Sequence, residues 1–177
     1  APSKLLLVGG EVQAVHVAGN AQFLDQPTSS GGTGLGNVDA CPSRLYSVVT
    51  TITGGAVYIE ALKAAEEAAR LAGHLLLAEF YRPGGPRGAG GHAEADAEAE
   101  ALIAGILQSR FPDWGFRGEE RRDLWRRGGD HVWVVDPNDG TQAYLKGWRG
   151  SAVSIALVHA GRPVLGAVCA YALGRGD

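Results

Sequence analysis

The chain has 177 residues, 45% of them hydrophobic, and its 16 basic and 19 acidic side chains give a formal net charge of −3. This length can bury one hydrophobic core, and the charge balance excludes a broad cationic surface for nucleic acid or anionic lipid. The longest apolar runs, such as residues 5–8, are far too short to cross a bilayer, so we expect a cytoplasmic protein.

The first 57 residues differ from the rest because charged side chains are sparse and glycine, serine and threonine are frequent. Short strands separated by glycine-rich turns are predicted at residues 4–8, 12–17 and 45–52. This part of the chain carries no strong motif. We therefore expect a strand-rich N-terminal segment of uncertain role, residues 1–57, followed by a functional domain over residues 58–177.

Two helices are predicted next. Over residues 58–81 apolar side chains recur at spacings of three and four, and Pro83 with its following glycines ends the pattern. Residues 84–91 are expected to form a flexible glycine-rich loop, and a second amphipathic helix is predicted over residues 93–110. Asp96 lies in its first turn. A carboxylate there is favoured by the helix dipole, so capping and catalysis both explain this residue.

Strands follow the helices. They are predicted at residues 131–135, 152–158 and 164–171, and the last two are expected to form a hairpin. Two helices followed by antiparallel strands indicate an α+β layered domain. His92 and His131 have no partner at a metal-binding spacing, so each is expected at the surface or in a loop.

The strongest motif is Trp-Val-Val-Asp-Pro-Asn-Asp-Gly-Thr, a strand that runs into two carboxylates and ends at Thr141. The apolar residues before Asp136 need burial, and Pro137 is expected to stop ladder pairing. Gly140 permits a backbone conformation closed to other residues, which would bring Asp136, Asp139 and Thr141 into one small volume. Crowded carboxylates repel one another unless a cation neutralises them, so a hard divalent metal is the economical explanation.

A second acidic pair, Glu119 and Glu120, follows Gly118, which is expected to mark a tight turn. With these residues in view, the chain resembles the inositol monophosphatase family of magnesium-dependent phosphatases. That family has a helix-opening acid, then Gly-Glu-Glu, then Trp-(Val/Ile)-(Val/Ile)-Asp-Pro-x-Asp-Gly-Thr, then a Ser-Ile-hydrophobic strand. The corresponding stretches here are residues 94–96, 118–120, 133–141 and 151–157, and the resemblance covers roughly residues 58–171.

The resemblance implies the family's layered α/β sandwich. This chain would contain mainly the N-terminal half of it, with two helices packed on an antiparallel sheet. The family's second half is absent after Asp177, so a truncated or rearranged fold is expected. A faint likeness of residues 4–25 to part of the missing half makes Asp25 a candidate for the absent metal-binding acid. The alternative is an unrelated strand segment that covers a sheet edge. The resemblance also implies a homodimer.

The resemblance assigns a metal site. Glu119, Asp136 and Asp139, together with the main-chain carbonyl of Asn138, would hold two or three Mg²⁺ ions. All four are hard oxygen donors, which suit Mg²⁺ or Mn²⁺ and argue against zinc or copper.

The resemblance also assigns catalytic roles. A water polarised by the metal and hydrogen-bonded to Thr141 would be the nucleophile, with Asp96 as general base through the threonine hydroxyl. Backbone amides of Gly140 and Thr141, at the start of a short helix over residues 142–145, would hold the substrate phosphate. Glu120 would orient water or metal ligands.

The expected function is magnesium-dependent hydrolysis of a small phosphate monoester, such as an inositol, sugar, histidinol or nucleoside phosphate, by metal-activated water. The partner would be a small phosphorylated metabolite, with no nucleic acid and no membrane. The alternative is a catalytically degenerate member that binds metal or phosphate, or a subunit that lacks the second half of the fold. Two departures favour this alternative: the missing C-terminal acid and a glycine-rich loop, residues 83–92, in place of the family's Lys- and Asp-bearing loop.

Overall fold

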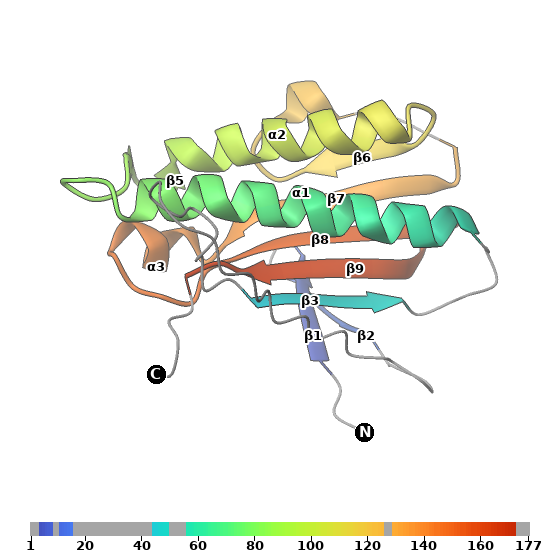
Figure 1. Ribbon diagram of the computed structural model, residues 1–177, viewed down its shortest axis with the longest axis horizontal. Helices are drawn as coiled ribbons and strands as arrows, with labels where there is room; N and C mark the ends of the chain where they lie inside the picture. The colour runs from blue at the N-terminus through green and yellow to red at the C-terminus, as the bar shows by residue number, and fades with distance from the viewer. Residues whose placement is uncertain (1–3, 9–10, 16–43, 50–55, 126–128, 173–177) are drawn as a thin grey trace, which may run out of the picture.

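Two long helices lie side by side on one face of a five-stranded sheet (Figure 1). The computed structural model describes the backbone of residues 4–8, 11–15 and 44–49, and all atoms of residues 56–125 and 129–172. Asp25 and the rest of residues 16–43 lie outside the described residues. The elements in chain order are β1 (Lys4–Val8), β2 (Glu11–Val15), β3 (Arg44–Val49), α1 (Ala56–Phe80), β4 (Gly88–Ala89), β5 (His92–Ala93), α2 (Glu94–Arg110), β6 (Gly115–Gly118), η1 (Arg122–Leu124), β7 (His131–Asp139), α3 (Thr141–Leu145), β8 (Ala152–His159) and β9 (Arg162–Ala170).

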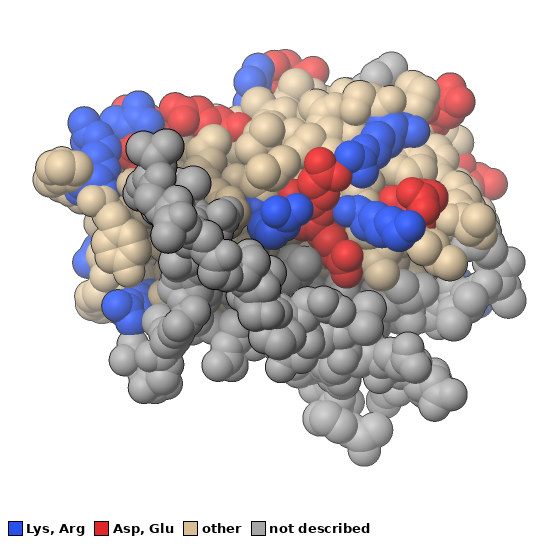
Figure 2. All heavy atoms as spheres, viewed as in Figure 1, with Lys and Arg blue, Asp and Glu red and all other residues tan. Residues whose placement is uncertain are grey.

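Both long helices begin and end within two residues of their predicted bounds. The buried stripe of α1 is made mostly of alanine, whose small side chain lets neighbouring elements approach closely. Gly73 continues the stripe, and a Cβ there would lie 2.9 Å from the Sγ of Cys169 in β9. Figure 2 shows acidic and basic side chains intermixed on the outer side of the helices. The fully buried alanines of α1 are Ala61, Ala64, Ala65, Ala68, Ala69 and Ala72.

The main sheet has the strand order β3-β9-β8-β7-β6. The predicted hairpin is confirmed as β8 and β9, which pair antiparallel, and β7 pairs antiparallel with β8. β6 pairs parallel with β7, an exception that the sequence did not indicate. β3 forms an edge strand on β9, so the segment before residue 57 contributes to this sheet. Among the described residues, no helix is both long and apolar enough to span a membrane.

The core lies between the sheet and the helices. Alternate residues of the central strands point toward α1 and α2, as the two-residue period of a strand requires. Trp133, Ile155 and Leu157 are fully buried there. Burial of side chains of this size contributes roughly 1.5 to 3 kcal/mol each. The sheet is therefore held rigidly enough to position polar groups at its ends.

β7 is longer than predicted. Pro137 was expected to stop ladder pairing, and the ladder is indeed interrupted there: Asp136 pairs with Ser154, and the next pair is Asp139 with Ala152, so the register shifts between them. The strand nevertheless resumes and ends at Asp139. This irregularity, a bulge, increases local twist and redirects side chains, which suits a position beside a functional site.

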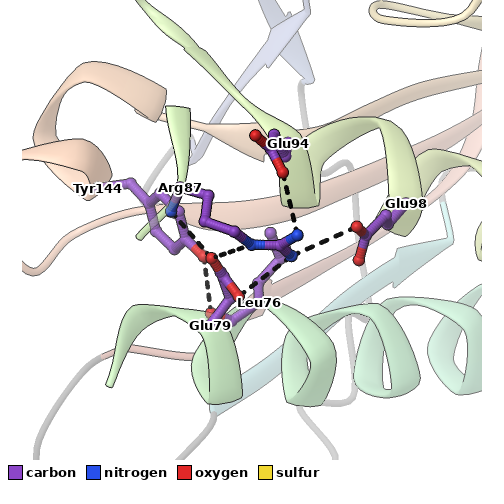
Figure 3. Close-up of polar contacts among 6 residues, drawn as sticks. All are labelled: Leu76, Glu79, Arg87, Glu94, Glu98 and Tyr144. Atoms are coloured by element: carbon purple, nitrogen blue, oxygen red, sulfur yellow. Dashed lines mark hydrogen bonds and ion pairs between the residues drawn. The ribbon is translucent and has the colours of Figure 1, made fainter. Parts of the chain in front are cut away.

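The flexible loop predicted over residues 84–91 instead contains an ordered anchor. β4 and β5 pair as a small hairpin, and Arg87 at its base reaches both helices (Figure 3). Its Nε lies 2.8 Å from Glu79 of α1, and its guanidinium lies 3.0 Å from Glu94 and 3.4 Å from Glu98 of α2. The backbone N–H of Arg87 also donates to Glu79 at 2.9 Å. Local composition does not reveal these tertiary contacts.

A stack of aromatic and imidazole rings lies where β7 begins. His131, expected in a loop or at the surface, is the half-buried first residue of β7. Its ring stacks on Trp114 at 4.5 Å and on His159 at 4.1 Å between centroids. The Tyr58 hydroxyl lies 3.0 Å from Nε2 of His131 and 3.0 Å from Nδ1 of His159. Burial, followed by the neighbouring His159, lowers the pKa of His131, so this cluster favours a neutral imidazole.

Candidate active site

Three elements bring the acidic residues together. Asp96 comes from the first turn of α2, Glu119 and Glu120 follow β6, and Asp136 and Asp139 flank the irregularity in β7. Because β6 and β7 are parallel, their carboxyl ends meet at the same edge of the sheet. Residues separated by more than forty positions in the chain thus converge there.

Glu119 faces Asp136 and Asp139. Burial raises the pKa of Asp136 to about 8, and the charge of Glu119 together with a hydrogen bond to Glu119 adds to the effect. Burial and the charge of Glu119 also raise the pKa of Asp139. The groups that disfavour ionisation here are therefore carboxylates acting on one another in a partly dry site. This is the convergence that the Asp-Pro-x-Asp-Gly-Thr motif predicts.

The donors fit a hard divalent cation in their chemistry. All are oxygens, which Mg²⁺ and Mn²⁺ prefer. Within residues 56–125 and 129–172, no three Asp, Glu, His or Cys side chains lie close enough to hold a metal ion as they stand. Burial and the neighbouring Glu119 raise the pKa of Asp136, so binding of a cation here would be coupled to deprotonation of Asp136.

Asp96 is fully buried, with both carboxylate oxygens engaged. The side-chain amide of Asn138 donates to Oδ1 at 2.8 Å, and the Thr141 hydroxyl lies 3.0 Å from Oδ2. Burial raises the pKa of Asp96, partly offset by these bonds and by the backbone N–H of Ala93. Asp96 thus lies in the first turn of α2, next to the N-cap Ala93, while it bonds Asn138 and Thr141.

Asn138 has a contact that the sequence did not reveal. Its main-chain carbonyl, expected to bind metal, lies 3.0 Å from the Thr141 hydroxyl. Its side chain is 2% exposed and bridges Asp96 to Tyr171, whose hydroxyl donates to the amide oxygen. A polar residue at the buried end of an apolar strand was the available signal, because such a group needs partners.

Gly140 has the conformation that the motif predicts. Its φ of 96° lies in the left-handed region that glycine adopts without strain, and it precedes α3 directly. Its carbonyl accepts the backbone N–H of Ala143 at 2.9 Å and the Ser151 hydroxyl at 3.2 Å. Thr141 is thereby placed beside Asp96. Phosphate binding by the amides of Gly140 and Thr141 stays a prediction.

Glu120 is the second acid of the Gly-Glu-Glu stretch. Burial, then the charges of Asp96 and Glu119, raises the pKa of Glu120, and the exposed His92 lies 3.9 Å away.

Gly118 was expected to mark a tight turn, but it is the last residue of β6. Glycine is needed there for another reason: a Cβ would overlap the carboxylate of Glu100. Sequence reasoning missed Glu100, although it follows Asp96 by four positions and so lies on the same helix face.

Comparison with known proteins agrees with this geometry. An inositol-1-monophosphatase of Rhizobium meliloti is 41% identical over 76 residues, which are 43% of this chain and 28% of that protein. A histidinol-phosphatase of Chlorobaculum parvum is 40% identical over 82 residues, which are 46% of this chain and 31% of that protein. The chain thus aligns with about a third or less of these curated relatives.

Solved structures show the same fold. The extragenic suppressor protein suhB of Bartonella henselae superposes with a TM-score of 0.58 at 30% identity, over 67% of this chain and 50% of that one. The IMPase of Thermotoga maritima gives a TM-score of 0.57 at 27% identity, over 67% and 49%. The sequence model of the inositol monophosphatase family matches residues 58–175, two-thirds of the chain. The chain belongs to the inositol monophosphatase family.

Proposed function

We propose that the protein hydrolyses a small phosphate monoester in a magnesium-dependent reaction. The observation that carries the proposal is the meeting of Glu119 with Asp136 and Asp139 beside the bonded pair Asp96 and Thr141. Family membership supports phosphatase chemistry, since relatives bear the names inositol-1-monophosphatase and histidinol-phosphatase. The chain spans only part of those relatives, so the activity and the substrate are both proposals.

Four oxygen donors would hold the metal: the carboxylates of Glu119, Asp136 and Asp139, and the main-chain carbonyl of Asn138. When bound, Mg²⁺ polarises phosphoryl oxygen and lowers the pKa of water. The chain contributes carboxyl groups that are already gathered and partly desolvated. Because Asp136 holds a proton near neutral pH without metal, ion binding and deprotonation of Asp136 are coupled.

Thr141 would relay a proton to Asp96. Its hydroxyl has one hydrogen and two acceptors at 3.0 Å, Asp96 and the carbonyl of Asn138, so it donates to one at a time. When it donates to Asp96, its lone pairs are available to accept a proton from an attacking water. The other oxygen of Asp96 is occupied by Asn138, which leaves Thr141 as the route. A raised pKa makes Asp96 a stronger base than an exposed aspartate.

Substrate contacts would come from the turn after β7. The amides of Gly140 and Thr141 open α3, where backbone N–H groups lack intrahelical partners and favour phosphate oxygens. Glu120, at the edge of the acidic cluster, would orient water or metal ligands. These roles complete a site for a small phosphorylated metabolite.

The direct test is phosphate release from inositol, sugar, histidinol and nucleoside monophosphates, with Mg²⁺, with Mn²⁺ and after chelation. We expect release from at least one monoester with metal and none after chelation. Release that chelation leaves unchanged would contradict metal dependence.

One observation favours a second candidate, a member that binds metal or phosphate without turnover. The loop between the long helices offers no carboxylate from residue 84 to residue 93, and its Arg87 is engaged by three glutamates (Figure 3). Saturable Mg²⁺ binding without hydrolysis of any monoester in the panel would select this candidate.

A further inference from the structure

Glu100 is a buried acid outside the proposed metal ligands. It lies on α2, one turn after Asp96, and is fully buried. Its carboxylate accepts the backbone N–H of Glu120 at 2.7 Å and that of Arg121 at 2.8 Å. A carboxyl group in such a place is tolerated only when hydrogen bonds compensate for lost water. The two amides supply that compensation, so helix and turn are fastened together.

The turn after β6 is also held on its other side. The indole N–H of Trp125 donates to the carbonyl of Gly118 at 2.8 Å. Gly118 itself gives the Glu100 carboxylate its room, because any side chain there would overlap it. The peptide groups on both sides of Glu119 are therefore fixed by partners outside the turn, Trp125 on one side and Glu100 on the other.

We propose that Glu100 is a positioning residue that keeps Glu119 directed at Asp136 and Asp139. The two N–H groups it binds belong to the peptide planes that follow Glu119, so they restrict the backbone dihedral angles that aim this side chain. Such restraint matters because Glu119 is exposed, so packing around its side chain does little to hold it in place. Without it, the turn would relax toward solvent and lower the affinity for a cation. The inference rests on the proposed metal-dependent function.

The test compares Glu100→Gln with Glu98→Gln, an exposed glutamate on the same helix. An amide at position 100 offers one acceptor oxygen and turns an NH₂ group toward the second N–H. We expect the amides of Glu120 and Arg121 to exchange with solvent on the order of tenfold faster. Calorimetric titration should show Mn²⁺ affinity weakened by roughly 10- to 100-fold, as for other residues that orient metal ligands. Glu98→Gln should change neither quantity.

Two results would overturn the inference: unchanged exchange of the two amides in Glu100→Gln, or faster exchange with unchanged Mn²⁺ affinity. In the second case the proposed function stands and the positioning role falls. If the wild-type protein binds neither Mg²⁺ nor Mn²⁺, the proposed function fails first, and the inference falls with it. Should Glu100→Gln fail to fold, Glu100→Asp, which keeps a carboxylate but shortens its reach to the two N–H groups, applies the same test with the same two readouts and the same expected direction.

Discussion

The two ends of β7 both bury titratable groups, but they differ in the partners that surround those groups. At one end, burial raises the pKa of Asp136 to about 8, and the neighbours are other carboxylates. At the other end, burial lowers the pKa of His131, and the Tyr58 hydroxyl bonds His131 and His159. Both ends favour neutral groups. The ring cluster reaches this state with its own partners, whereas the acidic cluster needs either protons or a cation.

The two ends of β7 make the stability of the protein depend on pH in opposite directions. The raised pKa of Asp136 means that its contribution to the stability of the metal-free protein is present below about pH 4 and is lost as pH rises through about 8. The lowered pKa of His131 means that its contribution is present above about pH 6.5 and is lost as pH falls.

The largest expected effect comes from Asp136→Asn. Losing one metal ligand should remove several kcal/mol of transition-state stabilisation, so turnover should fall on the order of a thousandfold. The metal-free protein should remain folded, because the substitution removes a repelled, buried acid. Phosphate-release kinetics and circular dichroism check both points. Full turnover in this variant would show that the acidic end of β7 does not carry the proposed reaction.

A smaller loss is expected from Asn138→Ala, which deprives buried Asp96 and Tyr171 of a shared partner. Leaving such groups unsatisfied costs about 1 to 3 kcal/mol of unfolding free energy. Urea denaturation measures it, and Gln142→Ala, at an exposed position of α3, is the control. Stability equal to wild type would show that the bridge does not hold Asp96.

The smallest effect belongs to the ring cluster. Tyr58→Phe removes the hydroxyl between the two imidazoles and should cost roughly 0.5 to 1.5 kcal/mol. Turnover and Mg²⁺ affinity should not change, because the cluster lies at the far end of β7. A change in metal affinity would mean that the two ends are coupled through the strand.

The sequence indicates much of this fold because its signals are local. Helix periodicity predicted α1 and α2, and alternation with turn residues predicted β8 and β9. The Asp-Pro-x-Asp-Gly-Thr motif predicted the meeting of Asp136 and Asp139, since the chain between them is short. Membership of the inositol monophosphatase family was also indicated by these residues.

Other features depend on contacts between distant residues and leave little local trace. Glu100 meets Glu120 across twenty positions, and Asn138 meets Asp96 across forty-two. His131 looked isolated because its stacking partners, Trp114 and His159, lie on other segments. The parallel pairing of β6 with β7 likewise follows from tertiary packing and not from either strand alone.

Thermal unfolding with and without Mg²⁺, at about pH 5 and about pH 8, tests the central claim most directly. On the proposed function, protons and Mg²⁺ would compete for the acidic cluster of Glu119, Asp136 and Asp139. We therefore predict a rise in Tm with Mg²⁺ that is large at the higher pH, small at the lower pH, and absent in Asp136→Asn. Identical Tm values with and without Mg²⁺ at both pH values would contradict a metal site at the end of β7.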